Sequence, residues 1–508
     1  MSAPTPTRAA VLDLGSNSFH VLVADVEGPH VDTVARAREM RHLGRTLVRR
    51  GELDAATVEL AAATVDRHLR LARRAGAEEV VVVATAALRE PEAAELLERL
   101  TELIGRPPTV LHGHEEARLA HLGARAAVLA DDRPLLVLDL GGGSLELAVG
   151  SGTRIDASTS VLLGASRLAA TVEGDPPDPE ELDGLIARLD GELAGALPAL
   201  QHHATERVVA VGGTVRAMAR HLAARADRWL PASVNLAPLD LDELEAATAE
   251  LLAATTAERT RLEGVSSRRA DHLHIAGLVL VRTLHALGVR HAVVSDWGLR
   301  EGVLLDRFGD LRAIPGDARR SHEVGRLVRA SRLDERDGLR LARLARRIDR
   351  ALSEGEDEGA QGLLDAAAQL HDIGSILPLR RQHEHGAYVI EQAELRGFSP
   401  RELAIVLSIV RFLPSRGVSG RYPPFASLDL DDRALARRLL GVLRLAVMLS
   451  ADGEAEVVAL RRSGELLEIT VRDTAGGVER LARDATDLEG RLRADLGIAV
   501  AIRSAPGG

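Results

Sequence analysis

The chain contains no cysteine, no lysine and no run of 18 apolar residues among its 508 positions. Without cysteine, disulfides and thiolate metal sites are excluded. Without lysine, a P-loop and Schiff-base catalysis are excluded too, since both depend on a lysine side chain. Any anion site must therefore use arginine, backbone N–H groups, hydroxyls or a metal ion.

Charge and the N-terminal sequence narrow the class further. The formal net charge is −11, which argues against a general nucleic-acid binder, although a local basic channel stays compatible with it. The first ten residues, "MSAPTPTRAA", lack the apolar core of a signal peptide. We therefore expect a cytoplasmic protein with no membrane association and, from its length, two to four domains.

Strand and helix patterns alternate up to about residue 308. Residues 9–26 and 134–150 both predict a strand, a tight turn and a second strand, and residues 78–88 predict a buried parallel strand. Beyond residue 310 the sequence becomes helical and rich in arginine. Residues 455–503 predict two strands, a helix and a last strand.

Two of these passages match each other. "DLGS" at Asp13–Ser16 and "DLGG" at Asp139–Gly142 both follow "VL" and both precede an alternating strand. The match predicts a duplicated domain. The alternative is coincidence between two common hairpins.

The glycine triplet Gly141–Gly143 belongs to the second of these turns. It does not fit a dinucleotide fingerprint, because "GGGSLELAV" opens a strand and not a helix. Consecutive N–H groups at such a turn can form an anion-binding nest. Ser144 and Glu146 lie two apart on a strand and share one face, so with Asp139 they can converge on a site whose hard oxygens suit Mg²⁺.

This duplicated hairpin, followed by a Gly-Gly-Thr turn at a helix start, resembles the actin, sugar-kinase and Hsp70 superfamily. Within it the chain is similar to the exopolyphosphatase/guanosine pentaphosphate phosphatase (Ppx/GppA) family. Seven segments carry the resemblance in family order: "LDLGSNSFHVLV" (12–23), "VATAALRE" (83–90), "HGHEEARLAHLG" (112–123), "LDLGGGSLELAVG" (138–150), "VGGTVRAMA" (211–219), "SSRRADHLHIAG" (266–277) and "SDWGLREGVL" (295–304).

The resemblance implies a role for each matching residue. Glu116 matches the family's catalytic glutamate, which activates a water molecule, and Arg89 matches an arginine near the phosphate. Glu115 and Glu116 are neighbours at a helix start, so only one of them can face the site. The implied phosphate-binding residues are Gly15, Ser16, Asn17, Ser18, Gly141, Gly142, Gly143, Ser144, Gly212, Gly213 and Thr214, and the implied metal ligands are Asp139, Glu146 and Asp13. One departure is Ala93, where the family usually has asparagine.

A second candidate site lies in the helical part, where His371 and Asp372 resemble the doublet of HD-type metal phosphohydrolases. By register, that fold's late aspartate falls on Val447, which cannot ligate a metal, and its upstream histidine falls on Asp337. The doublet is then a hydrogen-bonded relic. The alternative is that His322 supplies the missing ligand.

The arginines at 340, 343, 346 and 347 raise a related question. They form either a solvated helix face balanced by acidic residues or a track that guides a polyanion to the cleft.

Together these observations predict an α/β protein with two actin-like (RNase H-like) domains at 1–127 and 128–312. An HD-like helical domain at 318–454 and a small α+β tail at 455–508 would follow. The expected activity is Mg²⁺-dependent hydrolysis of terminal phosphoanhydride bonds of inorganic polyphosphate. The alternatives are a pppGpp 5′-phosphatase and a non-catalytic polyphosphate or nucleotide sensor. A homodimer is what the resemblance implies.

Overall fold

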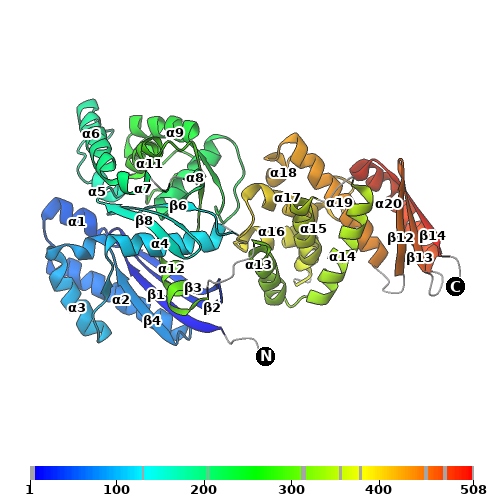
Figure 1. Cartoon of the computed structure of the whole chain (residues 1–508), viewed down its shortest axis with the longest axis horizontal. Coiled ribbons are helices and arrows are strands. Elements are labelled where there is room, and N and C mark those ends of the chain that lie inside the picture. Colours follow the sequence, from blue (N-terminus) through cyan, green and yellow to red (C-terminus); the bar gives the residue numbers. More distant parts are fainter. Residues whose placement is uncertain are drawn as a thin grey trace. The chain divides into compact units, whose positions relative to one another are not determined.

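The computed structural model describes residues 6–128, 131–201, 203, 205–310, 316–353, 357–376, 380–450, 456–472 and 477–505. The chain forms two compact units (Figure 1). The first comprises Met1–Arg228 and Val234–Gly316; the second comprises Trp229–Ser233 and Asp317–Gly508. None of the helices within the described ranges combines the length and hydropathy that crossing a bilayer requires.

The first sheet of the N-terminal unit has five strands in the order β3-β2-β1-β4-β5. Strands β1 (Thr7–Leu14), β2 (Ser18–Glu27) and β3 (His30–Met40) form an antiparallel meander, whereas β4 (Glu79–Ala84) and β5 (Thr109–Val110) extend the sheet in parallel. Both faces of β1 are buried, as expected for a strand that reads as a continuous apolar run.

Helices cover both faces of this sheet. Alternate residues of β1 pack with α2 (Ala55–Arg74) and α3 (Ala94–Ile104) on one face. The intervening residues of β1 pack with α4 (Gly113–Val128) and α12 (Leu299–Phe308) on the opposite face of the sheet. Helix α12 comes from the segment placed in the second domain by sequence, yet its core contacts are with the first sheet. Its Gly302 permits the close approach to α4, because a Cβ there would lie 1.8 Å from the Leu119 carbonyl oxygen.

The second sheet repeats the arrangement with six strands in the order β10-β11-β9-β6-β7-β8. Strands β6 (Leu135–Leu140), β7 (Leu145–Ser151) and β8 (Arg154–Val161) are antiparallel, and β9 (Val208–Val211) and β11 (His291–Val294) run parallel to β6. The short β10 (Pro238–Asp240) closes the far edge. Two sheets with the same antiparallel-then-parallel plan confirm the predicted duplicated α/β fold.

Further helices belong to the second half of this unit. They are α5 (Ala165–Ala169), α6 (Pro179–Ala196), α8 (Gly213–Arg225), α9 (Leu241–Ala253) and α11 (Leu273–Leu287), while α1 (Leu43–Arg50) and the 3₁₀ turn η1 (Ala86–Arg89) belong to the first half.

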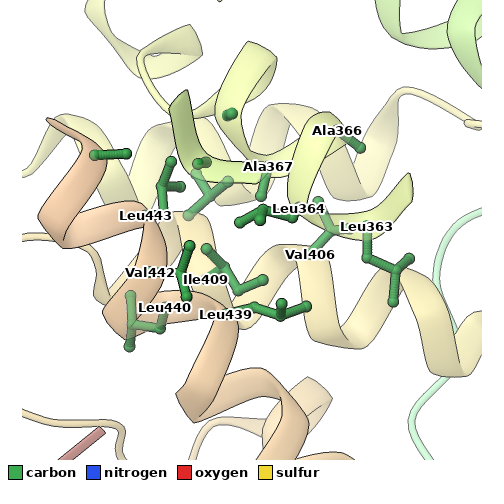
Figure 2. Packing of buried hydrophobic residues seen from close by; sticks show 14 of the residues in the cluster. Leu363, Leu364, Ala366, Ala367, Val406, Ile409, Leu439, Leu440, Val442 and Leu443 are labelled. Atoms are coloured by element: carbon green, nitrogen blue, oxygen red, sulfur yellow. The ribbon is translucent and has the colours of Figure 1, made fainter. Parts of the chain in front are cut away.

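The second unit is mainly helical, as predicted. Its helices include α13 (Gly316–Ala330), α14 (Glu335–Leu352), α15 (Glu358–Leu370), α16 (Gln382–Gln392), α17 (Pro400–Phe412) and α19 (Leu430–Ser450). Helix α17 is buried all round, which fits its apolar sequence. Figure 2 shows its Val406 and Ile409 between leucines of α15 and α19.

The C-terminal segment has the elements that its sequence predicts. Strands β12 (Glu456–Ser463) and β13 (Leu466–Arg472) are antiparallel, α20 (Gly477–Leu496) follows, and β14 (Ala499–Ser504) pairs with β13 in parallel. Buried residues of β13 and α20 join the same hydrophobic core as the helices.

Candidate active site

A cavity of ≈150 Å³ in the N-terminal unit collects most of the residues predicted from the sequence. It is formed by the β1–β2 turn, the β6–β7 turn, the β9–α8 turn and the start of α4 and α12. Every predicted phosphate-binding residue lines it, as do Glu116, Asp13 and Asp139. Arg89 and Glu146 are not among its described lining residues, but Arg89 donates a hydrogen bond to Glu116 and the charge of Glu146 raises the pKa of Glu116.

The two hairpins have the same backbone plan. Gly15 N donates to the Ser18 carbonyl at 3.2 Å, and Gly141 N donates to the Ser144 carbonyl at 3.0 Å. In each hairpin an aspartate from the first strand faces a residue of the second. Asp13 lies opposite His20 in β1/β2, and Asp139 lies opposite Glu146 in β6/β7. The two hairpins therefore pair equivalent positions across their strands. The residue opposite the aspartate differs, however, and is a histidine in the first hairpin and a glutamate in the second.

The glycine triplet lets the two hairpins touch. A Cβ at Gly143 would lie 2.4 Å from the Ser16 hydroxyl oxygen, and one at Gly142 would lie 2.8 Å from the Asn17 Cβ. Neither glycine has a positive φ, so the requirement is space and not an unusual backbone conformation. The close approach brings the turns of both hairpins to one cavity.

Glu116 lies in the first turn of α4 and is 7% exposed. The Arg89 guanidinium donates to its Oε2 at 3.0 Å and to the Leu111 carbonyl at 2.9 Å, which fixes the position of the carboxylate. Burial raises the pKa of Glu116 well above its usual value; nearby carboxylates add to the rise and Arg89 opposes it. Glu115 instead pairs with Arg118 at 2.8 Å and is 42% exposed on its side chain. Of the two adjacent glutamates, Glu116 faces the cavity.

Three more carboxylates surround Glu116 in the interior. Burial raises the pKa of Asp13 and of Asp139 to about 6, and each feels another nearby carboxylate. Burial and the charge of Asp139 raise the pKa of Glu146 to about 7, against hydrogen bonds from serine hydroxyls. One of these is the Ser160 hydroxyl, which donates to Oε1 at 2.8 Å. With all of these carboxylates ionised, their burial and their mutual repulsion are unfavourable unless a cation offsets the negative charge.

A divalent cation fits this cluster. Glu146 Oε2 is buried and makes no hydrogen bond, so an acceptor is left unused in the interior. Among the described residues no group of three or more acidic or histidine side chains forms a complete protein cage for a metal. Mg²⁺ does not need one, because it commonly binds one or two carboxylates and completes its shell with water and substrate phosphates. The residues present suit a cation that is shared with a phosphate substrate.

The β9–α8 turn supplies the third edge of the cavity. Gly212 has φ = +120°, and a Cβ there would lie 2.5 Å from the Leu140 carbonyl oxygen, so only glycine is accommodated. Thr214, in the first turn of α8, accepts a hydrogen bond from Arg269 at 2.9 Å. The free N–H groups at the start of this helix favour an anion.

Four arginines without a role assigned from the motifs also line the cavity: Arg38, Arg216, Arg269 and Arg300. Burial and the neighbouring guanidiniums lower the pKa of Arg269 to about 9, and the same causes lower the pKa of Arg38. Such mutual repulsion between cations is relieved by a bound polyanion. The sequence signal was the complete absence of lysine together with the arginines of "SSRRADHL" and "WGLREGVL".

In the second unit, His371 and Asp372 lie just after α15 and line a separate cavity of ≈1040 Å³. Val447 lines the same cavity, at the place the register predicts for the late aspartate. His371 Nδ1 hydrogen-bonds to the Ala368 carbonyl at 2.8 Å, and Asp337 pairs with Arg340 on α14. His322 is not among the described residues that line this cavity. A hydrogen-bonded relic remains the prediction for the doublet.

Three of the four α14 arginines in question, Arg340, Arg346 and Arg347, have partners in the same unit. Arg346 makes a two-pronged ion pair with Asp365, and Arg347 donates to the Val457 carbonyl at 3.0 Å. Because these guanidiniums are already paired, the arrangement favours the solvated, acid-balanced face over a polyanion track.

Comparisons with known proteins give matches in both units of the chain. The Ppx/GppA phosphatase family model matches residues 22–310, and the model for domain III of Ppx/GppA phosphatases matches residues 320–470. A guanosine-5′-triphosphate,3′-diphosphate pyrophosphatase of Vibrio vulnificus (strain YJ016) is 26% identical over 97% of this chain and 98% of its own. Exopolyphosphatase 1 of Mycobacterium tuberculosis (strain ATCC 25618 / H37Rv) is 30% identical over 59% of this chain and 88% of its own.

Solved structures place the N-terminal unit in the same group. The crystal structure of the Aquifex aeolicus Ppx/GppA family member matches with a TM-score of 0.51 and 26% identity over 59% of this chain and 97% of that one. An exopolyphosphatase-like protein matches with a TM-score of 0.54 and 25% identity over 59% and 98%. The duplicated sheets and paired hairpins thus define a protein of the actin-like α/β class. Within that class, the chain belongs to the Ppx/GppA phosphatase family.

Proposed function

We propose that this chain is an exopolyphosphatase, which hydrolyses the terminal phosphoanhydride bond of inorganic polyphosphate and releases orthophosphate. The observation that carries the proposal is the buried Glu116, held by Arg89 at 3.0 Å and facing a cavity lined by glycines, hydroxyls and arginines. A buried carboxylate with a raised pKa is a stronger base than an exposed one once it is ionised.

In this mechanism Glu116 removes a proton from a water molecule as the water oxygen attacks the terminal phosphorus. The bond from that phosphorus to the bridging oxygen breaks, and the shortened chain leaves with the electron pair. Arg216, Arg269 and Arg300 line the cavity, where they would offset the charge on the phosphate oxygens. Positioning and charge neutralisation do most of the work, because the reaction asks for no covalent bond to the protein.

Mg²⁺ is the proposed cofactor, held by Asp139 and Glu146 with Asp13 nearby. When bound, it would neutralise phosphate oxygens and polarise the reacting group. The orphaned Glu146 Oε2 and the raised pKa values of these acids support it. A cytoplasmic location and a homodimer complete the proposal, together with the absence of nucleic-acid and membrane partners.

A second candidate substrate is pppGpp, whose 5′-terminal phosphate is released by the same chemistry. It is favoured by one observation: the Vibrio vulnificus relative, which matches nearly the whole chain, is named for a guanosine triphosphate-diphosphate substrate. The mycobacterial exopolyphosphatase matches a smaller part.

The direct test is phosphate release from long-chain polyphosphate, short-chain polyphosphate and pppGpp, each with Mg²⁺ and with EDTA. The proposal predicts release from polyphosphate that requires Mg²⁺. Phosphate release from pppGpp but not from polyphosphate would show that the protein is a pppGpp 5′-phosphatase and not an exopolyphosphatase. Tight binding of either compound with no release would favour the sensor.

A further inference from the structure

His20 lines the cavity of the candidate site but belongs to none of the roles assigned above. It lies on β2 two residues after Ser18, so both side chains point to the same face of the strand. Its Nε2 lies 2.7 Å from the Ser18 hydroxyl oxygen, and its Nδ1 lies 2.9 Å from a guanidinium nitrogen of Arg300. The ring therefore connects an arginine of α12 with a hydroxyl of the first phosphate loop.

The partner on Nδ1 determines where the ring proton is. A guanidinium has only donors, so Nδ1 must accept the hydrogen bond from Arg300. The ring then carries its proton on Nε2 and donates it to the Ser18 oxygen. A neutral ring is also what the surroundings favour, since burial and the cations Arg300, Arg38, Arg216 and Arg269 all lower the pKa of His20.

The serine hydroxyl is affected in turn. A hydroxyl oxygen that accepts from Nε2–H must send its own proton in another direction. The Ser18 carbonyl is already the acceptor for Gly15 N, and Ser18 is one of the residues that line the cavity. An anion in that cavity would receive the Ser18 proton as a hydrogen bond.

The second hairpin shows the opposite arrangement at the equivalent place. Ser144 is followed two residues later by Glu146. Burial raises the pKa of Glu146, and hydrogen bonding from Ser144 works against that rise. An ionised carboxylate only accepts, so it draws the serine proton to itself. Of the two equivalent serines, Ser18 is the one with a histidine ring at hydrogen-bond distance from its hydroxyl.

We propose that His20 is a positioning residue, which holds the Ser18 hydroxyl as a hydrogen-bond donor to a substrate phosphate, with Arg300 fixing its tautomer. The inference rests on the proposed function only in taking a phosphate as the anion. It adds a determinant of substrate binding, distinct from the base Glu116.

Two substitutions separate the functions of the ring. His20→Gln keeps a donor near the position of Nε2 and loses the acceptor near Nδ1; His20→Asn does the reverse. We expect His20→Asn to raise KM for the phosphate substrate and to weaken binding of inorganic phosphate by roughly 3- to 10-fold, the size of one hydrogen bond, with little change in kcat. His20→Gln should restore most of that loss. His285→Gln, on an exposed histidine paired with Glu245, is the matched control.

A double-mutant cycle gives the decisive comparison. If His20 acts through Ser18, His20→Asn should add almost nothing to the phosphate-binding loss of Ser18→Ala. Additive losses would overturn the proposal. Phosphate binding is measured by calorimetry, so the cycle can be completed even if the wild-type protein releases no phosphate, an outcome that would count against the proposed function instead.

The tautomer is tested on the full-length wild-type protein by ¹⁵N-resolved NMR, with the His20 resonances identified by their loss in His20→Gln. The expected spectrum has a protonated Nε2 and an unprotonated Nδ1 at neutral pH. A proton on Nδ1, alone or on both nitrogens, would contradict the proposal without reference to activity.

Discussion

The two hairpins of the N-terminal unit have matching turns and matching strand register, but they differ where the chemistry is placed. In the first, Asp13 faces His20, which is bonded to Arg300. In the second, Asp139 faces Glu146, which lies beside the catalytic candidate Glu116. One duplicated framework therefore carries a histidine–arginine contact in the first hairpin and, in the second, a pair of carboxylates that together with Glu116 form the acidic side of the site.

The difference between the residues of the two hairpins suits the two demands of the proposed reaction. A polyanionic substrate must be bound by positive charge, but a base that activates water must not be paired so strongly that it loses its proton affinity. The two demands are met by different residues at the equivalent positions of the hairpins, His20 with Arg300 in the first and Glu146 in the second, although Arg216 and Arg300 also act on Asp139. Arg89, which pairs with Glu116, is a further contact between a guanidinium and these carboxylates.

The largest expected effect comes from Glu116→Gln, which keeps the shape of the acidic side and removes its base. General-base catalysis typically contributes about 10²- to 10⁴-fold, so kcat should fall by that order. Glu115→Gln is the matched control, because that side chain pairs with Arg118 and leaves the cavity untouched. The measurement is steady-state phosphate release together with substrate binding. We expect release by Glu116→Gln to fall while its substrate binding stays unchanged. Wild-type turnover in Glu116→Gln would remove this residue from its role.

Next in size is the comparison of the two equivalent aspartates. We expect Asp139→Asn to raise the Mg²⁺ concentration needed for half-maximal activity by roughly 10- to 100-fold, the range seen when groups that support a metal are removed. Asp13→Asn should have the smaller effect, since its cross-strand partner is a histidine and not a second carboxylate. Mg²⁺ titrations of both variants test this. Equal shifts would mean that the hairpins share the metal evenly.

A smaller effect is expected on stability. Asp13 and Asp139 titrate near pH 6 and Glu146 near pH 7 in the fold, but all three near pH 4 when unfolded. The folded protein then binds more protons, so its stability falls as pH rises from about 4 to 7, by about 1.4 kcal/mol for each unit of pKa displacement. Chemical denaturation without Mg²⁺ at pH 5 and pH 7.5 measures this.

Mg²⁺ should recover part of that loss at pH 7.5, because it offsets the ionised carboxylates. Asp139→Asn is the control and should flatten the pH dependence. If the metal-free protein became more stable as the pH rises from 5 to 7.5, the raised pKa values of these three acids would be contradicted.

The smallest effect is expected in the second unit. His371→Ala with Asp372→Ala should leave turnover and its Mg²⁺ dependence unchanged if the doublet is a relic. The free energy of unfolding should drop by about 1 kcal/mol for the lost hydrogen bond to the Ala368 carbonyl. A loss of metal-dependent phosphate release would show instead that the doublet is a second active centre.

Much of the site was predictable, because it lies in contiguous motifs. Both hairpins, the Gly-Gly-Thr turn and the pair Glu115–Glu116 are local in sequence, and strand periodicity alone places Ser144 and Glu146 on one face. Helical geometry also predicts that only one of the two glutamates faces the site. The resemblance selects Glu116 of the two, and in the structure Glu116 lines the cavity whereas Glu115 pairs with Arg118.

The rest depends on long-range packing. Arg38, Arg216, Arg269 and Arg300 come from four distant segments, so no local pattern brings them together. Helix α12 returns to the first sheet because Gly302 and Gly123 allow it to cross α4 closely, a contact between positions far apart in the chain. In the edge strand β3 Val31 is the one buried residue, so little of the strand's sequence is constrained to be apolar.

The central claim is that water attacks the terminal phosphorus of the substrate on the acidic side of the cavity. Hydrolysis in H₂¹⁸O with Mg²⁺, followed by mass spectrometry of the products, tests it most directly. The account predicts that the label enters the released orthophosphate and is absent from the shortened polyphosphate or nucleotide, and that Glu116→Gln slows this incorporation. Label in the shortened product would place the attack on the next phosphorus and contradict the account.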